Sequence, residues 1–233
     1  MKSYLLIGQS NMAGFGFYKD AVEVKTNNIK LMKCGLWRDF RRPISNYVPS
    51  AGGVCLGERF GELCAEYNGE PVGIIPCAMG NTSLSQWQPG ENLYDHTVAI
   101  CKIAQRESEI AGVLWHQGEA DCGDDLYPLY KEKLMNIINS LRKDLSLDKV
   151  PFLLGGLGEY LEKRCDEPYF ETKFKNYIKI NEILQSLEKE DPYIGYVSSE
   201  GLTSNPDLLH FTAQSLYTFG ERYFEKYKAI KER

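Results

Sequence analysis

The chain of 233 residues is 43% hydrophobic and 25% charged, with a formal net charge of −5. This length suits one domain, and the apolar content excludes a disordered chain, which lacks the apolar surface to offset the entropy of ordering. The basic residues are scattered, so we expect no nucleic-acid partner and no anionic membrane partner. The longest apolar runs are also too short to span a bilayer.

The N-terminal apolar segment, residues 4–7, is too short for the core of a signal peptide, and no small-residue cleavage site follows it. The seven cysteines are an odd number and include no C-x-x-C pair. In a chain without a secretory signal, this usage favours reduced and packed thiols. We therefore expect a cytoplasmic protein.

Five short apolar runs end in polar or glycine-rich turns, as buried parallel strands do. Helical spacing of apolar residues occupies the intervals between them, and a final helix is expected from about Thr212 to Lys228. Strands that alternate with helices indicate a parallel sheet covered on both faces. The expected strands are residues 4–7, 72–76, 112–115, 152–155 and 193–197.

Two stretches depart from this alternation. Residues 15–54 contain no convincing amphipathic helix, only a possible hairpin around residues 29–32 and 34–37. Residues 156–171 have the composition of a long connection, and such connections are usually functional or mobile. Because no repeat, low-complexity tract or linker divides the chain, we expect residues 1–233 to form one domain.

A serine lies directly after the first predicted strand, in the segment 8–14. Open α/β sheets bind ligands at the carboxyl ends of their strands, and the flanking Gly8 and Gly14 allow a close backbone approach. Serine also favours helix caps and turns. Ser10 is thus either a nucleophile or an ordinary capping residue, and its position alone does not decide between them.

Two further polar segments follow the second and third predicted strands. In residues 77–82 the turn at Gly80 frees backbone N–H groups that can donate to a developing negative oxygen, although a plain turn is the simpler interpretation of that segment alone. Residues 115–121 bring an imidazole, an amide and two carboxylates into one strand-end turn. Packing alone does not explain that density of polar groups.

A carboxylate and an imidazole precede the last predicted helix. The three-residue spacing of Asp207 and His210 lets the carboxylate approach the ring and fix its tautomer, whereas the alternative is a capping aspartate beside a surface histidine. A serine needs a base to take its proton. The four segments supply a nucleophile, a base with its carboxylate, and oxyanion donors at one edge of one sheet, and so predict a serine hydrolase.

Three of these segments resemble the blocks of the SGNH hydrolase superfamily: GQSNMAG at 8–14, WHQGEAD at 115–121, and Asp207-x-x-His210-Phe211. The closer similarity is to sialate O-acetylesterases and family-six carbohydrate esterases, which include acetylxylan esterases. Residues 35–37, 52–57 and 82–87 extend the resemblance over nearly the whole chain. It implies a three-layer α/β/α sandwich with a flavodoxin-like, mainly parallel five-stranded sheet.

The resemblance also implies roles for individual residues. Ser10 corresponds to the nucleophile, His210 to the general base and then acid, and Asp207 to the carboxylate that orients it. The oxyanion donors are the backbone N–H groups of Ser10 and Gly80 and the side chain of Gln117, which replaces the asparagine of the wider superfamily. Supporting positions in the same blocks are Gln9, Asn11, Asn81 and Glu119.

Asn81 is a departure from the related enzymes, which usually have Gly-Gly-Thr where this chain has Gly80-Asn81-Thr82. Asparagine tolerates left-handed backbone conformations better than most residues, so the turn is expected to persist.

The implied reaction removes acetyl groups from a carbohydrate, such as an acetylated xylo-oligosaccharide or sialic acid, through an acyl-enzyme and without a metal or organic cofactor. One alternative is a lipase or thioesterase with an acyl groove formed by residues 15–54. Another is a non-catalytic carbohydrate-binding module. A third is a metal-dependent hydrolase that uses His116, Glu119 and Asp121, with Asp124 or Asp125 as a further ligand.

Overall fold

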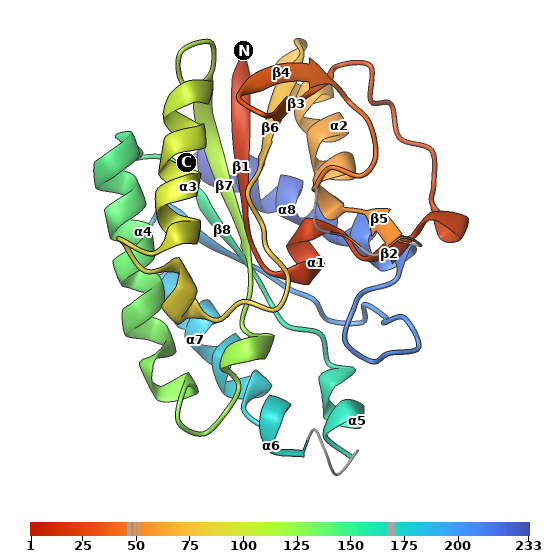
Figure 1. Ribbon diagram of the computed structural model, residues 1–233, viewed down its shortest axis with the longest axis vertical. Coiled ribbons are helices and arrows are strands. Elements are labelled where there is room, and N and C mark those ends of the chain that lie inside the picture. Colours follow the sequence, from red (N-terminus) through yellow and green to blue (C-terminus); the bar gives the residue numbers. More distant parts are fainter. Residues whose placement is uncertain (46–47, 49, 51, 167–170) are drawn as a thin grey trace.

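A central seven-stranded sheet organises the chain, as the computed structural model shows for residues 1–45, 48, 50, 52–166 and 171–233 (Figure 1). The strand order is β4-β3-β6-β1-β7-β8-β9, and β2 (Gly16–Phe17) pairs separately with β5 (Gly52–Val54). All neighbours in the large sheet are parallel except β3 and β4. Its strands are β4 (Leu36–Asp39), β3 (Ile29–Lys33), β6 (Val72–Pro76), β1 (Lys2–Gly8), β7 (Glu109–His116), β8 (Phe152–Gly155) and β9 (Ile194–Val197).

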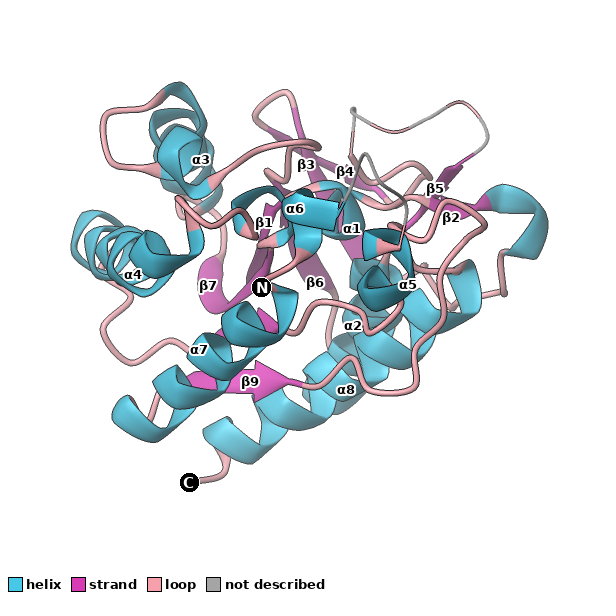
Figure 2. Cartoon of the chain, turned by 90° about the horizontal axis from the view of Figure 1, so that it is seen from below, coloured by secondary structure: helices cyan, strands magenta, loops and turns pink. Residues whose placement is uncertain are grey.

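Helices cover both faces of this sheet, which gives the three-layer α/β/α arrangement (Figure 2). The pair α2 (Leu56–Asn68) and α8 (Ala213–Lys231) covers one face. The opposite face is covered by α3 (Asn92–Ala104), α4 (Tyr130–Leu145) and α7 (Tyr177–Glu190). Three short helices lie near the carboxyl ends of the strands: α1 (Ser10–Ala13), α5 (Leu161–Cys165) and α6 (Glu171–Phe174).

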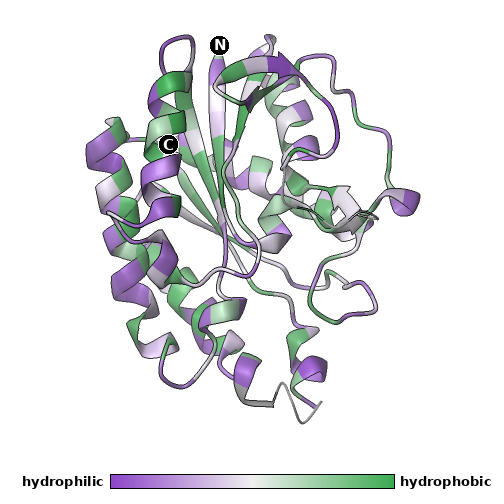
Figure 3. Cartoon of the chain, viewed as in Figure 1, coloured by the Kyte–Doolittle hydropathy of each residue, from purple (hydrophilic) through white to green (hydrophobic). Residues whose placement is uncertain are grey.

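The apolar core lies between the layers. Figure 3 shows mostly hydrophobic colouring on the central strands and polar residues on the outer sides of the helices. In β1, Tyr4, Leu5, Leu6 and Ile7 are at most 1% exposed. A strand buried on both faces cannot alternate apolar and polar residues, which explains the continuous apolar runs of the sequence.

The fold class predicted from the sequence is confirmed, with all five expected strands in the parallel sheet. The strand count is corrected from five to seven. The possible hairpin forms β3 and β4, and β3 also pairs with β6 because its Ile29 and Leu31 are buried against the core. Cys34 and Gly35 adopt φ values of 50° and 75°, which suit a tight hairpin turn.

The two irregular stretches differ in their outcome. The described part of residues 15–54 contains no α-helix, only short strands and a 3₁₀ turn at Tyr18–Asp20. The connection at 156–171 includes α5 and the start of α6, while residues 167–170 lie outside the described part. Five of the seven cysteines are buried, as expected for packed thiols. No helix in the described ranges is both long and apolar enough to cross a bilayer.

Candidate active site

Ser10 is the first residue of α1, directly beyond the carboxyl end of β1. The helix is capped by Gln9, so Ser10 is not the capping residue that the sequence left as an alternative. The chain turns sharply at Gly8, where φ is 129° and an added Cβ would lie 2.1 Å from the carbonyl oxygen of His116. Only glycine fits this turn, and it brings the serine hydroxyl to the end of the sheet.

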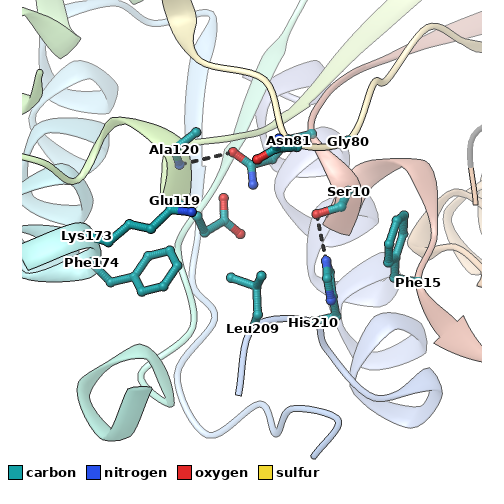
Figure 4. A pocket seen from close by; sticks show the side chains of 11 residues that line it. Ser10, Phe15, Gly80, Asn81, Glu119, Ala120, Lys173, Phe174, Leu209 and His210 are labelled. Carbon is teal, nitrogen blue, oxygen red and sulfur yellow. Dashed lines mark hydrogen bonds between the residues drawn. The ribbon is translucent and has the colours of Figure 1, made fainter. Parts of the chain in front are cut away.

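Asp207, His210 and Ser10 form a continuous hydrogen-bonded chain (Figure 4). His210 Nε2 lies 2.9 Å from Ser10 Oγ, and His210 Nδ1 lies 2.6 Å from Asp207 Oδ2. Although burial acts to raise the pKa of Asp207, hydrogen bonds from the His210 ring and from two backbone N–H groups hold it below its usual value. The carboxylate therefore stays ionised beside the imidazole.

The turn that carries His210 is locally constrained. Asp207 Oδ1 accepts the backbone N–H groups of Leu209 and His210, each at 3.0 Å, and Leu208 adopts a φ of 51°. A left-handed conformation is unfavourable for leucine, so the surrounding contacts must hold it. One such contact closes the turn, because the backbone N–H of Asn205 donates to the His210 carbonyl at 2.7 Å.

Asn11 connects α1 to the backbone on both sides of His210. Its Nδ2 donates to the Leu209 carbonyl at 3.1 Å, and its Oδ1 accepts the Phe211 N–H at 3.1 Å. The same Nδ2 donates to Glu119 Oε1 at 2.7 Å. Since Asn11 is 1% exposed, these bonds are protected from water, and they fix the position of the imidazole relative to the serine.

The segment after β6 lies alongside the end of β1, because the backbone N–H of Met79 donates to the Gly8 carbonyl at 3.0 Å. This contact places Gly80 and Asn81 in the wall of the same cavity as Ser10. Asn81 has a φ of 57°, the left-handed conformation that asparagine tolerates better than most residues. The N–H of Ser10, at the start of a helix, has no partner within that helix.

The structure does not bring the Gln117 amide to this cavity. Gln117 is fully buried, and its Nε2 donates to the Thr82 carbonyl at 3.0 Å and to Asp121 Oδ2 at 2.6 Å. An amide NH₂ has two hydrogens, so both are already used. Gln117 thus ties the second and third blocks together, and the geometry does not support its expected role as an oxyanion donor.

A cavity of about 160 Å³ opens beside Ser10 and His210. Its apolar lining consists of Phe15, Phe174 and Leu209, and the ring of Phe15 stacks on His210 with centroids 4.4 Å apart. The sequence analysis missed these three residues and Lys173, which also lines the cavity. For Phe15, its place directly after the first block was the only available signal.

The polar side of the cavity contains Gln9 and Glu119, together with Asn81. Glu119 is 2% exposed, and burial raises the pKa of its carboxyl group, although nearby backbone N–H groups and the hydrogen bond from Asn11 partly oppose the shift. Glu119 is hydrogen-bonded to Asn11, which also donates to the Leu209 carbonyl beside His210, whereas Asp207 contacts the imidazole ring directly.

The residues that would bind a metal ion in the metal-dependent alternative have separate surroundings. His116 is buried against Phe211 and Phe219, and burial lowers its pKa to about 3, so the ring is neutral. Asp121 accepts hydrogen bonds from Gln117 and from a backbone N–H. Within the described ranges, no group of three histidine, cysteine or acidic side chains is arranged to hold a metal ion. The remaining histidine, at position 96, is exposed on α3.

The family model for carbohydrate esterases described as sialic acid-specific acetylesterase matches residues 1–229 of this chain. The chain belongs to this family. A probable carbohydrate esterase of Arabidopsis thaliana, At4g34215, is 26% identical over 93% of this chain and 86% of that protein. The family and this relative identify the chain as a carboxylic ester hydrolase.

Solved structures support the same fold. The crystal structure of At4g34215 has a TM-score of 0.84 at 24% identity and covers 98% of both chains. The structure of NanS has a TM-score of 0.73 at 16% identity, covering 99% of this chain and 98% of that one. XAC1771, a carbohydrate acetylesterase from Xanthomonas citri, has a TM-score of 0.68 at 17% identity, covering 98% of this chain and 56% of that one. At these identities the structures establish the fold.

Proposed function

We propose that this esterase removes O-acetyl groups from a carbohydrate through an acyl-enzyme formed on Ser10. The observation that carries the proposal is the hydrogen-bonded chain from Ser10 Oγ to His210 Nε2, at 2.9 Å, and from His210 Nδ1 to Asp207 Oδ2, at 2.6 Å. These are the contacts that a serine needs to lose its proton as it attacks, and that an imidazole needs to carry the resulting charge.

In the proposed reaction, Ser10 Oγ attacks the acetyl carbonyl carbon while His210 Nε2 takes the hydroxyl proton. The backbone N–H groups of Ser10 and Gly80 donate to the oxyanion, and Asp207 stabilises the imidazolium. His210 then gives the proton to the departing sugar oxygen, which leaves as the alcohol. A water molecule repeats the sequence on the acetyl-enzyme, releasing acetate and restoring the serine.

The size of the cavity supports a short acyl group. A dry protein cavity of about 150 Å³ holds a molecule the size of benzene. A cavity of about 160 Å³ beside Ser10 is therefore large enough for an acetyl group with the first atoms of the alcohol, whereas a fatty acyl chain would extend beyond it into solvent. For this reason we favour an acetylesterase over the lipase and thioesterase alternatives.

The test is acetate release from 4-nitrophenyl acetate and from a panel of acetylated sugars that includes acetylated sialic acid and xylo-oligosaccharides. We expect Ser10→Ala to lower kcat by on the order of 10⁴- to 10⁶-fold without changing Tm. Ser85→Ala is the matched control, because Ser85 is exposed and lies outside the cavity. Sugar binding without ester cleavage, or full activity of Ser10→Ala, would contradict the proposal.

A further inference from the structure

The cavity beside Ser10 is lined by both apolar and polar side chains. Phe15, Phe174 and Leu209 contribute apolar surface that forms no side-chain hydrogen bonds, and Figure 4 shows Phe15 beside His210 and Phe174 at the opposite end of the cavity. Gln9 and Glu119 line the same cavity with an amide and a carboxylate. An acetyl group needs apolar contact and the oxyanion donors, so it makes no use of this amide and carboxylate.

Glu119 has one oxygen in use and one without a partner. Oε1 accepts the Asn11 Nδ2–H at 2.7 Å, which fixes the orientation of the carboxylate. Oε2 is buried and accepts no hydrogen bond from the described residues. Figure 4 shows the carboxylate directed into the cavity, toward the side of Ser10 and His210. A buried acceptor without a partner is costly, and a bound ligand can supply the missing donor.

Gln9 presents the complementary group. Its Oε1 accepts the backbone N–H of Ala120 at 3.4 Å, so the amide is oriented with Nε2 as the remaining group. No hydrogen bond joins this Nε2 to another described residue. Gln9 is 4% exposed and lines the cavity, so its two N–H donors have little access to bulk water.

An acceptor and a donor in one small cavity match a hydroxyl group, which donates one hydrogen bond and accepts others. A cationic ligand is a poorer match, because Lys173 lines the same cavity, and an anionic ligand would face Glu119. We propose that Glu119 and Gln9 bind a free hydroxyl on the alcohol half of the substrate, close to the ester. This selects partially acetylated polyols over acetates of simple alcohols, and it rests on the proposed function.

The test compares two esters that differ by one hydroxyl, the 1-acetate of propane-1,2-diol and propyl acetate. For the wild type, we expect kcat/KM to favour the hydroxylated ester by about ten- to a hundredfold, the effect of one well-placed hydrogen bond to a charged group. In Glu119→Gln, which retains an acceptor for Asn11, we expect this ratio to fall by about tenfold. Gln9→Met, similar in size, should lower it in the same direction.

The ratio separates recognition from support of the catalytic residues. Both esters share the acetyl group and the attack by Ser10, so a shift of His210 affects both rates and cancels. Ser85→Ala is the control, because Ser85 is exposed and lies outside the cavity, so both rates and their ratio should stay unaltered.

An equal rate for the two esters in the wild type would overturn this inference while leaving the acetylesterase proposal intact. So would a ratio that both Glu119→Gln and Gln9→Met leave unchanged. If neither these esters nor any of the acetylated sugars is hydrolysed in a Ser10-dependent reaction, both proposals are overturned.

Discussion

Replacing Asn11 with aspartate would test how the histidine is held. The two side chains have the same shape, and the new carboxylate still accepts the Phe211 N–H, which lies 3.1 Å from Oδ1 in the wild type. The substitution removes the NH₂ group that donates to Glu119 at 2.7 Å and to the Leu209 carbonyl at 3.1 Å. It also places a second carboxylate against that of Glu119.

The magnitude follows from the distance of 2.7 Å between Asn11 Nδ2 and Glu119 Oε1. Two unit charges at that separation repel by about 6 kcal/mol in an effective dielectric constant of about 20. Because this approaches the whole stability of a typical domain, we expect the two carboxyl groups to share one proton, which raises the apparent pKa of the pair.

The sign of the pH effect follows from proton counting. With the pKa of the pair raised in the folded state, the folded protein binds more protons than the unfolded chain, so stability falls as pH rises above the unfolded value of about 4. In the wild type, burial also raises the pKa of Glu119, so this residue makes stability fall with rising pH as well, but no second carboxylate adds to the effect. The difference between variant and wild type therefore grows toward neutral pH.

The assay is thermal or urea unfolding at pH 4 to 8. At pH 4 the proton shared by the two carboxyl groups replaces the hydrogen bond to Glu119, and only the one to the Leu209 carbonyl is lost. We therefore expect Asn11→Asp to be less stable than wild type by about 1 kcal/mol at pH 4, and by about 3 kcal/mol more at pH 8. We also expect kcat to fall by about 100-fold, because the Leu209 carbonyl loses its donor and the backbone next to His210 shifts. Asn11→Ala is the control that removes the donor without adding a charge. Parallel stability curves for Asn11→Asp and wild type would refute this reasoning.

Three further outcomes are expected. Asp207→Asn should lower kcat by about 10²- to 10⁴-fold, because an amide facing His210 Nδ1 favours the wrong ring tautomer, and an unchanged kcat would count against the proposed role. Since the pKa of Asp207 is lowered in the folded state, the wild type loses stability as the pH falls through that range, and this variant should lack that loss. Gly8→Ala should prevent stable folding, because the added Cβ would lie 2.1 Å from the His116 carbonyl oxygen. Gly69→Ala, with a φ of 66° and open space around it, should lower the free energy of unfolding by only about 1 kcal/mol, and equal Tm values for the two variants would contradict this difference. Dialysis against EDTA should leave the esterase rate unchanged, and a loss restored by a metal ion would reopen the metal-dependent alternative.

The sequence by itself determined the parallel sheet and the segments that meet at its carboxyl edge. Strands buried on both faces must be continuously apolar, so residues 4–7 and 152–155 were recognisable from composition alone. Gly8 likewise marked a turn that no other residue can make. The edge hairpin was only suggested, because pairing of β3 with β6 depends on contacts distant in the chain.

Only the tertiary structure decided which polar groups have partners. Ser10 and His210 are 200 positions apart, and their contact depends on the loop position that Asn11 fixes. The motifs contain two glutamines. Both N–H donors of the Gln117 side chain are hydrogen-bonded within the protein, whereas the side-chain amide of Gln9 lines the cavity. Spacing along a chain records which residue types are present, whereas hydrogen-bond direction is set by neighbours that the fold brings in from elsewhere.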